Sequence, residues 1–118
     1  MPAAVGLLLV GLPLPIWAFM TFDQLVVLQF SRHPEQWVRD RRPCTFMRPA
    51  TGIPRTVRSA LAAQWCSISW VFVTPAWVAR DPDCAGLLRR LRLLTAAWCL
   101  IVVPLTGIAA AAGLQIAL

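Results

Sequence analysis

The chain has 118 residues, of which 58% are hydrophobic and 14% are charged. This length allows at most one domain, and soluble domains hold only about 45–50% apolar and about 25% charged residues. A soluble fold of this size cannot bury so much apolar surface, so lipid must solvate part of the chain. The net charge of +6 includes eleven arginines that all lie between residues 32 and 92, with long uncharged stretches at both ends. This pattern predicts a membrane hairpin whose basic middle attracts anionic lipid headgroups, and it argues against nucleic acid as a partner.

The first predicted element is a transmembrane helix with a cytoplasmic extension, over residues 1–30. Its apolar part, residues 2–22, suffices because about twenty helical residues cross the roughly 30 Å hydrocarbon core. Pro13 and Pro15 each remove a backbone donor, so we expect a kink or local unwinding there. No basic segment precedes the apolar run, so we do not expect this span to be a cleaved signal peptide.

Asp23 follows this span, and two interpretations of it are open. An ionisable side chain inside a membrane is a candidate functional group by default. However, the preceding residues place Asp23 about 30 Å along the helix axis, at the level of the headgroups. We therefore expect an interfacial carboxylate that pairs with an arginine.

Residues 31–58 are predicted to form an Arg- and Pro-rich cytoplasmic loop on the membrane surface. Four residues within this stretch, Pro43, Pro49, Gly52 and Pro54, forbid long regular structure, although a short helix fits residues 35–41.

Residues 59–79 are predicted to form an interfacial or half-buried amphipathic helix. The apolar run over residues 59–73 is short for a span. A third transmembrane helix here would place the seven arginines of residues 31–58 opposite the four of residues 80–92. The positive-inside rule disfavours that arrangement. Three tryptophans, Trp65, Trp70 and Trp77, favour interfacial depth because an indole is apolar with one polar edge.

Residues 80–118 are predicted to form the second transmembrane helix, with a basic N-terminal extension. Asp81 and Pro82 are typical of the N-cap and the first position of a helix. Pro104 is expected to kink the helix. The small residues between Gly107 and Gly113 would let the first span or a partner helix approach closely.

The sequence predicts no catalytic, cofactor or metal site. The four cysteines are far apart without a C-x-x-C pair, and His33 is the only histidine. Zinc sites are usually recognised from close Cys or His pairs, so we interpret the cysteines as small buried hydrophobes. His33 could bind haem or chlorophyll, but its place outside both spans and next to Pro34 favours a surface turn. No nucleophile, base and orienting group come together, so we expect a protein that is not an enzyme.

The contact residues predicted from the sequence fall into two groups. Basic and tryptophan side chains are expected to contact lipid headgroups or a partner, and small side chains are expected to serve helix packing. The first group is Arg39, Arg41, Arg42, Arg89, Arg90, Arg92, Trp65, Trp70 and Trp77, and the second is Gly107, Ala109, Ala111 and Gly113.

Two local segments resemble the bacterial membrane-bound universal stress protein B family. They are Asp23-Gln24-Leu25-Val26-Val27-Leu28-Gln29 after the first span and Leu88-Arg89-Arg90-Leu91-Arg92 before the second. The layout of two apolar ends around a polar middle extends the resemblance over most of the chain, although this middle is richer in Trp and Pro. The resemblance implies a bacterial inner-membrane protein linked to stress or stationary phase, without enzymatic activity.

These observations predict an all-α integral membrane protein with two transmembrane helices and an Arg-rich cytoplasmic region. Both termini would be periplasmic, in the bacterial inner membrane. The first functional hypothesis is an accessory or structural subunit of a larger inner-membrane complex, photosynthetic or respiratory, that also binds anionic lipid. The alternatives are a free-standing stress-response membrane protein and a small oligomeric channel or transporter.

Overall fold

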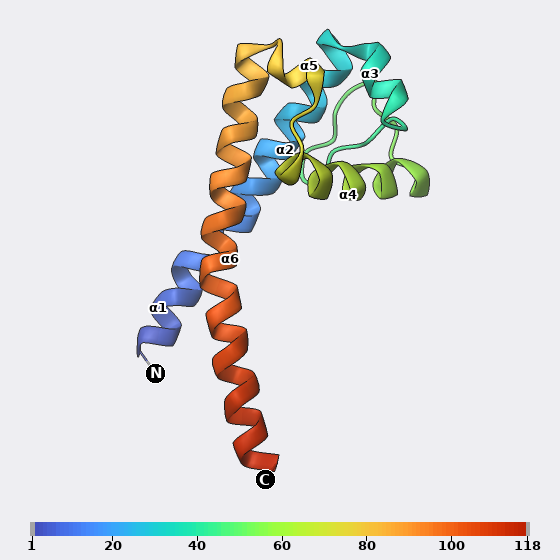
Figure 1. Cartoon of the computed structure of the whole chain (residues 1–118). Coiled ribbons are helices and arrows are strands. Elements are labelled where there is room, and N and C mark those ends of the chain that lie inside the picture. The colour runs from blue at the N-terminus through green and yellow to red at the C-terminus, as the bar shows by residue number, and fades with distance from the viewer. Residues whose placement is uncertain (1, 118) are drawn as a thin grey trace.

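The computed structural model describes residues 2–117, in which every regular element is a helix. Two long helical legs descend from a head, and the two ends of the chain lie on the same side of that head (Figure 1). The long dimension of the molecule is 55 Å, against 30 and 23 Å across. The elements are α1 (Pro2–Gly11), α2 (Pro13–Arg32), α3 (Pro34–Arg39), α4 (Val57–Phe72), α5 (Ala76–Ala79) and α6 (Pro82–Ala117).

The first leg consists of α1 and α2, which are interrupted at Leu12. The interruption agrees with the kink or local unwinding expected at Pro13, which begins the second helix where its missing N–H costs nothing. Leu12 keeps a helical backbone conformation, and Pro15 lies inside α2 without a break. Helix α2 then continues beyond the first apolar stretch to Arg32, where the helical conformation stops at His33 before Pro34.

The second leg is α6, an uninterrupted helix of 36 residues. At about 1.5 Å per residue such a helix is about 54 Å long, which accounts for the long dimension of the molecule. Asp81 caps its start as predicted, since Asp83 N–H donates to Asp81 Oδ1 at 3.2 Å. The helix passes through Pro104 without a break.

The head contains α3, α4, α5 and the upper parts of α2 and α6, with α4 extending sideways from the legs (Figure 1). Helix α4 begins at a capping box in which Thr56 and Ser59 exchange side-chain to backbone hydrogen bonds. It ends where Val73 becomes extended before Pro75. The predicted single helix over residues 59–79 is therefore two helices, because Pro75 cannot continue the first one.

A row of aromatic side chains passes through the core of the head. Phe22 of α2 lies 5.3 Å from the ring of Trp70, which lies 5.6 Å from Trp77, and Trp77 lies 5.2 Å from His33. Trp70 and Trp77 are only 4% and 5% exposed. The prediction that these two tryptophans contact lipid or a partner is wrong, because they fill the space between α2 and the other head helices instead.

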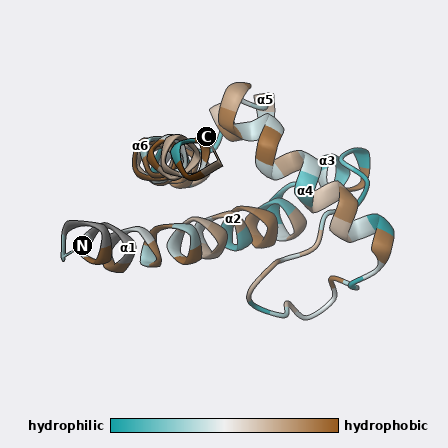
Figure 2. Ribbon diagram, turned by 90° about the horizontal axis from the view of Figure 1, so that it is seen from below, coloured by the Kyte–Doolittle hydropathy of each residue, from teal (hydrophilic) through white to brown (hydrophobic). Residues whose placement is uncertain are grey.

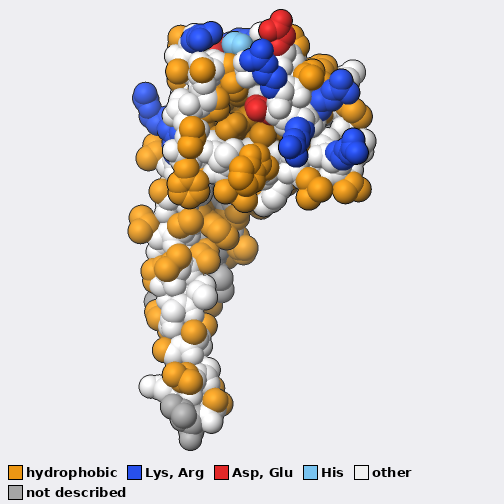
Figure 3. Space-filling model, turned by 45° about the vertical axis from the view of Figure 1, so that its right-hand side comes forward, with side chains coloured by type: hydrophobic (Ala, Val, Ile, Leu, Met, Phe, Trp, Pro, Cys, Tyr) orange, Lys and Arg blue, Asp and Glu red, His pale blue; other side chains and the backbone are white. Residues whose placement is uncertain are grey.

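Two helices, α2 and α6, are long and apolar enough to cross a membrane. Within the most apolar window, 33% of α2 is buried in the fold but only 6% of α6. Hydrophobic residues continue along the legs (Figures 2 and 3), and exposed ones include Leu93, Leu100 and Val103 of α6. An apolar surface of this kind is what a bilayer or a partner helix covers. The all-helical fold with two apolar helices is compatible with a membrane protein.

Candidate functional site

An arginine-lined groove of about 1120 Å³ lies between the end of α3 and one face of α4. Its basic side chains come from two segments: Arg39, Arg41 and Arg42 from the end of α3 and the following turn, and Arg58 from the first turn of α4. Leu61 and Trp65 of α4 also line it. We call the site formed by these six residues the arginine groove. Arginine side chains are prominent on the head in the view of Figure 3, whereas none is seen on the leg.

The turn after α3 directs two of these arginines away from the helix. Arg41 and Arg42 adopt left-handed backbone conformations, with φ of 65° and 56°. Such conformations are uncommon for residues other than glycine and cost roughly 1–2 kcal/mol each. Three hydrogen bonds hold the turn: Arg41 N–H to Val38 O, Arg42 N–H to Trp37 O, and Trp37 Nε1–H to Pro43 O. Two consecutive strained residues in a cleft are typical of a functional segment.

The arginine groove carries an excess of positive charge, because four arginine side chains and one carboxylate, Asp40, line it. Within residues 2–117, Arg32 is the arginine that forms ion pairs, and its partners are Asp81 and Asp83. The guanidinium groups of the groove arginines have neither an ion pair nor a hydrogen-bonded acceptor among the described residues. Asp40 also lines the groove, but its carboxylate accepts a hydrogen bond from Gln29 Nε2 at 2.6 Å. Four guanidinium groups around one hollow therefore favour an anion that accepts several hydrogen bonds.

The side of the groove formed by α4 is bordered by apolar residues. The exposed large hydrophobic residues of α4 recur at the spacing of one helical face: Val57, Leu61, Trp65, Ile68 and Phe72. Trp65 is 71% exposed, and Phe72 is 80% exposed. A helix with one buried face and one exposed apolar face, next to arginines, is typical of an element at a membrane surface. A ligand with an anionic head and an apolar tail would match the arginines of the groove and the exposed apolar face of α4.

The structure distributes the predicted contact residues over three environments. Arg39, Arg41, Arg42 and Trp65 meet at the arginine groove. Arg89 and Arg90 lie exposed on α6, outside the residues that line the groove. Arg92 is engaged internally, because its guanidinium donates to Trp70 O and to Thr74 Oγ1. Arg92 is only half-buried, so its predicted contact with lipid headgroups stays a prediction. Arg58 was missed, although its place in the first turn of an amphipathic helix could have indicated it.

Asp23 does not pair with an arginine side chain. It is 3% exposed, and its carboxylate accepts the backbone N–H groups of Phe46, Met47 and Arg48 at 2.6, 2.7 and 3.0 Å. The interfacial ion pair expected from the sequence is thus replaced by a link between α2 and the loop that follows the groove arginines. The three backbone N–H groups stabilise the negative charge of the buried carboxylate, as the free N–H groups in the first turn of a helix do.

The small residues of α6 do not mediate the contact between the legs. A Cβ added at Gly107 or Gly113 would have no described neighbour within 4 Å, and Ala109 and Ala111 are exposed. The close approach between the legs lies nearer the head, where a Cβ on Gly11 would meet Ile101 Cγ2 at 3.4 Å. The predicted packing of residues 107–113 on the first span is therefore wrong for the described residues, and packing on a partner stays a prediction.

Two cysteines of the head, Cys66 and Cys84, are poor nucleophiles. Cys66 and Cys84 are 3% and 0% exposed. Burial raises the pKa of each thiol to about 12, with Asp40 adding to the effect at Cys66 and Asp81 at Cys84. Both are therefore protonated thiols at neutral pH, whereas nucleophilic catalysis requires the thiolate.

No protein-family model, curated protein or solved structure matches this chain. The resemblance to the universal stress protein B family stays a prediction.

Proposed function

We propose that this chain is a small non-catalytic integral membrane protein whose head binds anionic lipid at the arginine groove. The observation that carries the proposal is the juxtaposition of four arginines with the exposed apolar face of α4. The phosphate of a lipid headgroup would accept hydrogen bonds from the guanidinium groups, and the acyl chains of the same lipid would pack along Leu61 and Trp65. Each arginine near an anionic membrane surface contributes about 1 kcal/mol, which is about fivefold in affinity.

The proposed orientation places the head in the cytoplasm and both chain ends in the periplasm of a bacterial inner membrane. All eleven arginines lie between residues 32 and 92, and the structure places both ends on the same side of the head. Positive charge is retained on the cytoplasmic side of membranes. Alkaline phosphatase fused after residue 118 would be active in this orientation, and a fusion in residues 48–52 would be inactive. The opposite pattern would contradict the orientation.

The proposal includes attachment to a larger inner-membrane complex as an accessory subunit. Support comes from α6, whose most apolar window is only 6% buried although it contains small residues that permit close helix contact. Solubilisation in mild detergent, followed by native electrophoresis and mass spectrometry, tests this proposal. Migration with other proteins at constant stoichiometry would support it. A band of this chain alone would favour the stress-protein alternative, and a defined homo-oligomer would favour the channel.

The lipid site is tested by native mass spectrometry of the detergent-solubilised protein with phosphatidylglycerol or phosphatidylcholine. We expect retention of the anionic lipid, and a large loss of it when Arg39, Arg41, Arg42 and Arg58 are replaced by Gln. The charge-matched control replaces four arginines that lie outside the groove, Arg55, Arg80, Arg89 and Arg90, and should retain the lipid. Equal loss in both variants would assign the effect to net charge and reject the groove as the site.

Brominated lipids test the depth of α4. Trp65 is exposed, whereas Trp70 lies in the core. Lipids brominated near the headgroup should therefore quench less fluorescence after Trp65→Phe, and the quenched fraction should not fall after Trp70→Phe. Quenching that is insensitive to Trp65→Phe would contradict an interfacial position for α4.

A further inference from the structure

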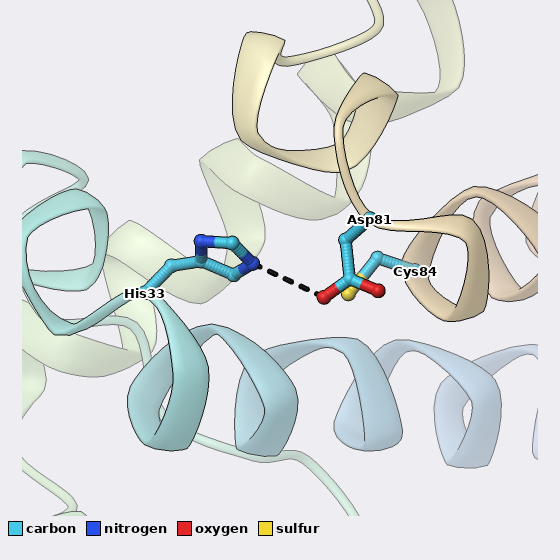
Figure 4. A group of neighbouring side chains, drawn as sticks. All are labelled: His33, Asp81 and Cys84. Atoms are coloured by element: carbon cyan, nitrogen blue, oxygen red, sulfur yellow. Dashed lines mark hydrogen bonds and ion pairs between the residues drawn. The ribbon is translucent and has the colours of Figure 1, made fainter.

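Three side chains with different donor atoms converge where α2 ends and α6 begins. They are His33, Asp81 and Cys84, and their nitrogen, oxygen and sulfur atoms all lie within 4.8 Å of one another. His33 Nε2 is 3.2 Å from Asp81 Oδ2. Figure 4 shows the imidazole reaching across from the α2–α3 junction to the carboxylate, with the sulfur of Cys84 beside it. This cluster lies in the head and takes no part in the arginine groove.

The backbone fixes all three positions. His33 N–H donates to Gln29 O at 2.8 Å, and the His33 ring packs on Trp77 at 5.2 Å. Asp81 caps α6, and Cys84 follows three residues later in its first turn. Residues three apart in a helical turn lie on the same side, so the carboxylate and the thiol face the imidazole together. A preformed arrangement of this kind lowers the cost of ordering the ligands around an ion.

Solvent exposure increases from Cys84 through Asp81 to His33. Cys84 is 0% exposed, whereas the side chains of Asp81 and His33 are 12% and 25% exposed. Water is therefore largely excluded around the sulfur, while the imidazole side remains accessible to solvent. An ion could reach the site from the His33 side and would be held in surroundings of low polarity.

The charges around the cluster would balance those of a divalent cation. Arg32 donates to Asp83 at 2.9 Å and to Asp81 at 3.3 Å. Asp83 neutralises Arg32, so a carboxylate at Asp81 and a thiolate at Cys84 would together carry two negative charges next to a neutral imidazole. On binding, the ion would take the place of the Cys84 thiol proton, which would pass to solvent.

We propose that His33 Nε2, an Asp81 carboxylate oxygen and Cys84 Sγ bind one zinc-class divalent ion. A set of one nitrogen, one oxygen and one sulfur suits Zn²⁺, whereas Mg²⁺ and Ca²⁺ require oxygen ligands. In a tetrahedral site, bonds of about 2.0–2.3 Å place two ligand atoms roughly 3.3–3.8 Å apart. The three donor atoms already lie within 4.8 Å of one another, so side-chain rotations that draw them together by up to about 1.5 Å would close the site. Water would complete the tetrahedron. The bound ion would join the end of the first leg to the start of the second.

The three proposed ligands do not form a recognisable motif in the sequence, and for this reason no metal site was expected there. His33 and Asp81 are 48 residues apart, and Cys84 has no second cysteine or histidine nearby in the chain. Only the hairpin brings the donors together.

The test uses the full chain in detergent after removal of metal with EDTA. Zn²⁺ is titrated against a chromophoric chelator, and Co²⁺ is added in parallel as a spectroscopic probe. We expect one Zn²⁺ per chain and a thiolate-to-cobalt charge-transfer band. Cys84→Ser should abolish the band and weaken Zn²⁺ binding about a hundredfold or more, since loss even of residues behind the ligands costs about 10–100-fold. Cys99→Ser is the matched control, because Cys99 is an exposed thiol lower on α6, and it should leave both readouts unchanged.

His33→Gln provides a second variant that keeps a polar group beside Asp81 and should also weaken Zn²⁺ binding. Circular dichroism checks that both variants keep their helices. If both fail to fold, the Co²⁺ spectrum of the Cys99→Ser protein decides, because the proposal requires a thiolate band there. Absence of that band, or equal Zn²⁺ affinity with and without Cys84, would overturn the proposal and leave a hydrogen-bonded link between the legs.

Discussion

Arg92 of α6 donates two hydrogen bonds to the carbonyl oxygen of Trp70, from Nε at 3.2 Å and from Nη2 at 3.0 Å. Trp70 belongs to the last turn of α4, where backbone carbonyls have no partner within the helix. The guanidinium therefore serves as a cap that the second leg supplies to the surface helix. Nη2 also donates to Thr74 Oγ1 at 2.8 Å, which fixes the chain just after α4. Arg92 therefore helps to fix the orientation of α4 relative to the second leg, together with the packing of Trp70 in the core.

Replacing Arg92 by Gln should destabilise the head. Hydrogen bonds from a charged donor contribute about 1.5–3 kcal/mol, and the shorter amide cannot reproduce both of them. Arg89→Gln is the matched control, because Arg89 is exposed on the same helix and such substitutions change stability by less than about 0.5 kcal/mol. Thermal unfolding in detergent, followed by tryptophan fluorescence, measures both. Equal melting temperatures for the two variants would show that the Arg92 cap contributes nothing.

Replacing Asp23 by Asn should loosen the loop that contains Phe46, Met47 and Arg48. The carboxylate accepts three backbone N–H groups, whereas an amide offers one oxygen and turns an NH₂ group towards the remaining donors. The expected loss is about 3 kcal/mol, since each unsatisfied buried donor costs about 1–3 kcal/mol. Hydrogen exchange at these three amides should accelerate. Gln24→Ala, at the exposed neighbouring position, should leave their exchange unchanged.

Two glycines should respond to alanine in opposite directions. Gly52 has φ of +87°, and an added Cβ would lie 3.2 Å from the ring of Phe30, so Gly52→Ala should destabilise the protein by about 1–2 kcal/mol. Gly86 lies inside α6 with open space around it, so Gly86→Ala should stabilise by about 0.5–1 kcal/mol. Melting temperatures that move in the same direction would contradict this assignment.

The pH dependence of stability should contain a contribution from Asp40. Burial raises the pKa of this carboxyl above 3.8, and the hydrogen bond from Gln29 opposes the shift only in part. The folded state therefore binds the proton more tightly than the unfolded state. Stability from this group is present at low pH and is lost as pH rises through the folded-state pKa.

Asp40→Asn should remove that contribution and leave the protein at least as stable at neutral pH. The Asn oxygen still accepts from Gln29 Nε2, and its amide N–H is suited to Gln29 Oε1, which has no partner among the described residues. Melting temperatures of both proteins between pH 4 and pH 7 test this prediction. A wild-type protein that loses stability relative to the variant on acidification would contradict the sign.

The hairpin could be predicted from the sequence because charge placement and apolar length act along the chain. The break at Leu12, the continuation of α2 to Arg32 and the Asp81 cap follow from local rules about proline and helix ends. These features need no knowledge of a distant partner. They were accordingly predicted to within a few residues.

The roles of individual side chains in the head could not be predicted in the same way. A tryptophan in a membrane interface and one in a core share an apolar body with one polar edge, so only the packing of α4 on α2 distinguishes Trp65 from Trp70. Arg92 and Asp23 likewise resemble interfacial charges until their partners are known. Both partners are backbone groups of segments more than twenty residues away, and backbone groups leave no signature in the sequence.

The break at Leu12 makes the two legs mechanically unequal. Helix α6 is continuous from the head to Ala117, whereas the first leg has a joint between α1 and α2. Membranes differ in thickness by a few ångströms, and helices adapt by tilting or bending at modest cost. In a thinner bilayer α1 would swing at this joint, while α6 would have to tilt as one rod and carry the head with it. In the proposed membrane orientation, the height and tilt of the arginine groove relative to the bilayer would then vary with bilayer thickness.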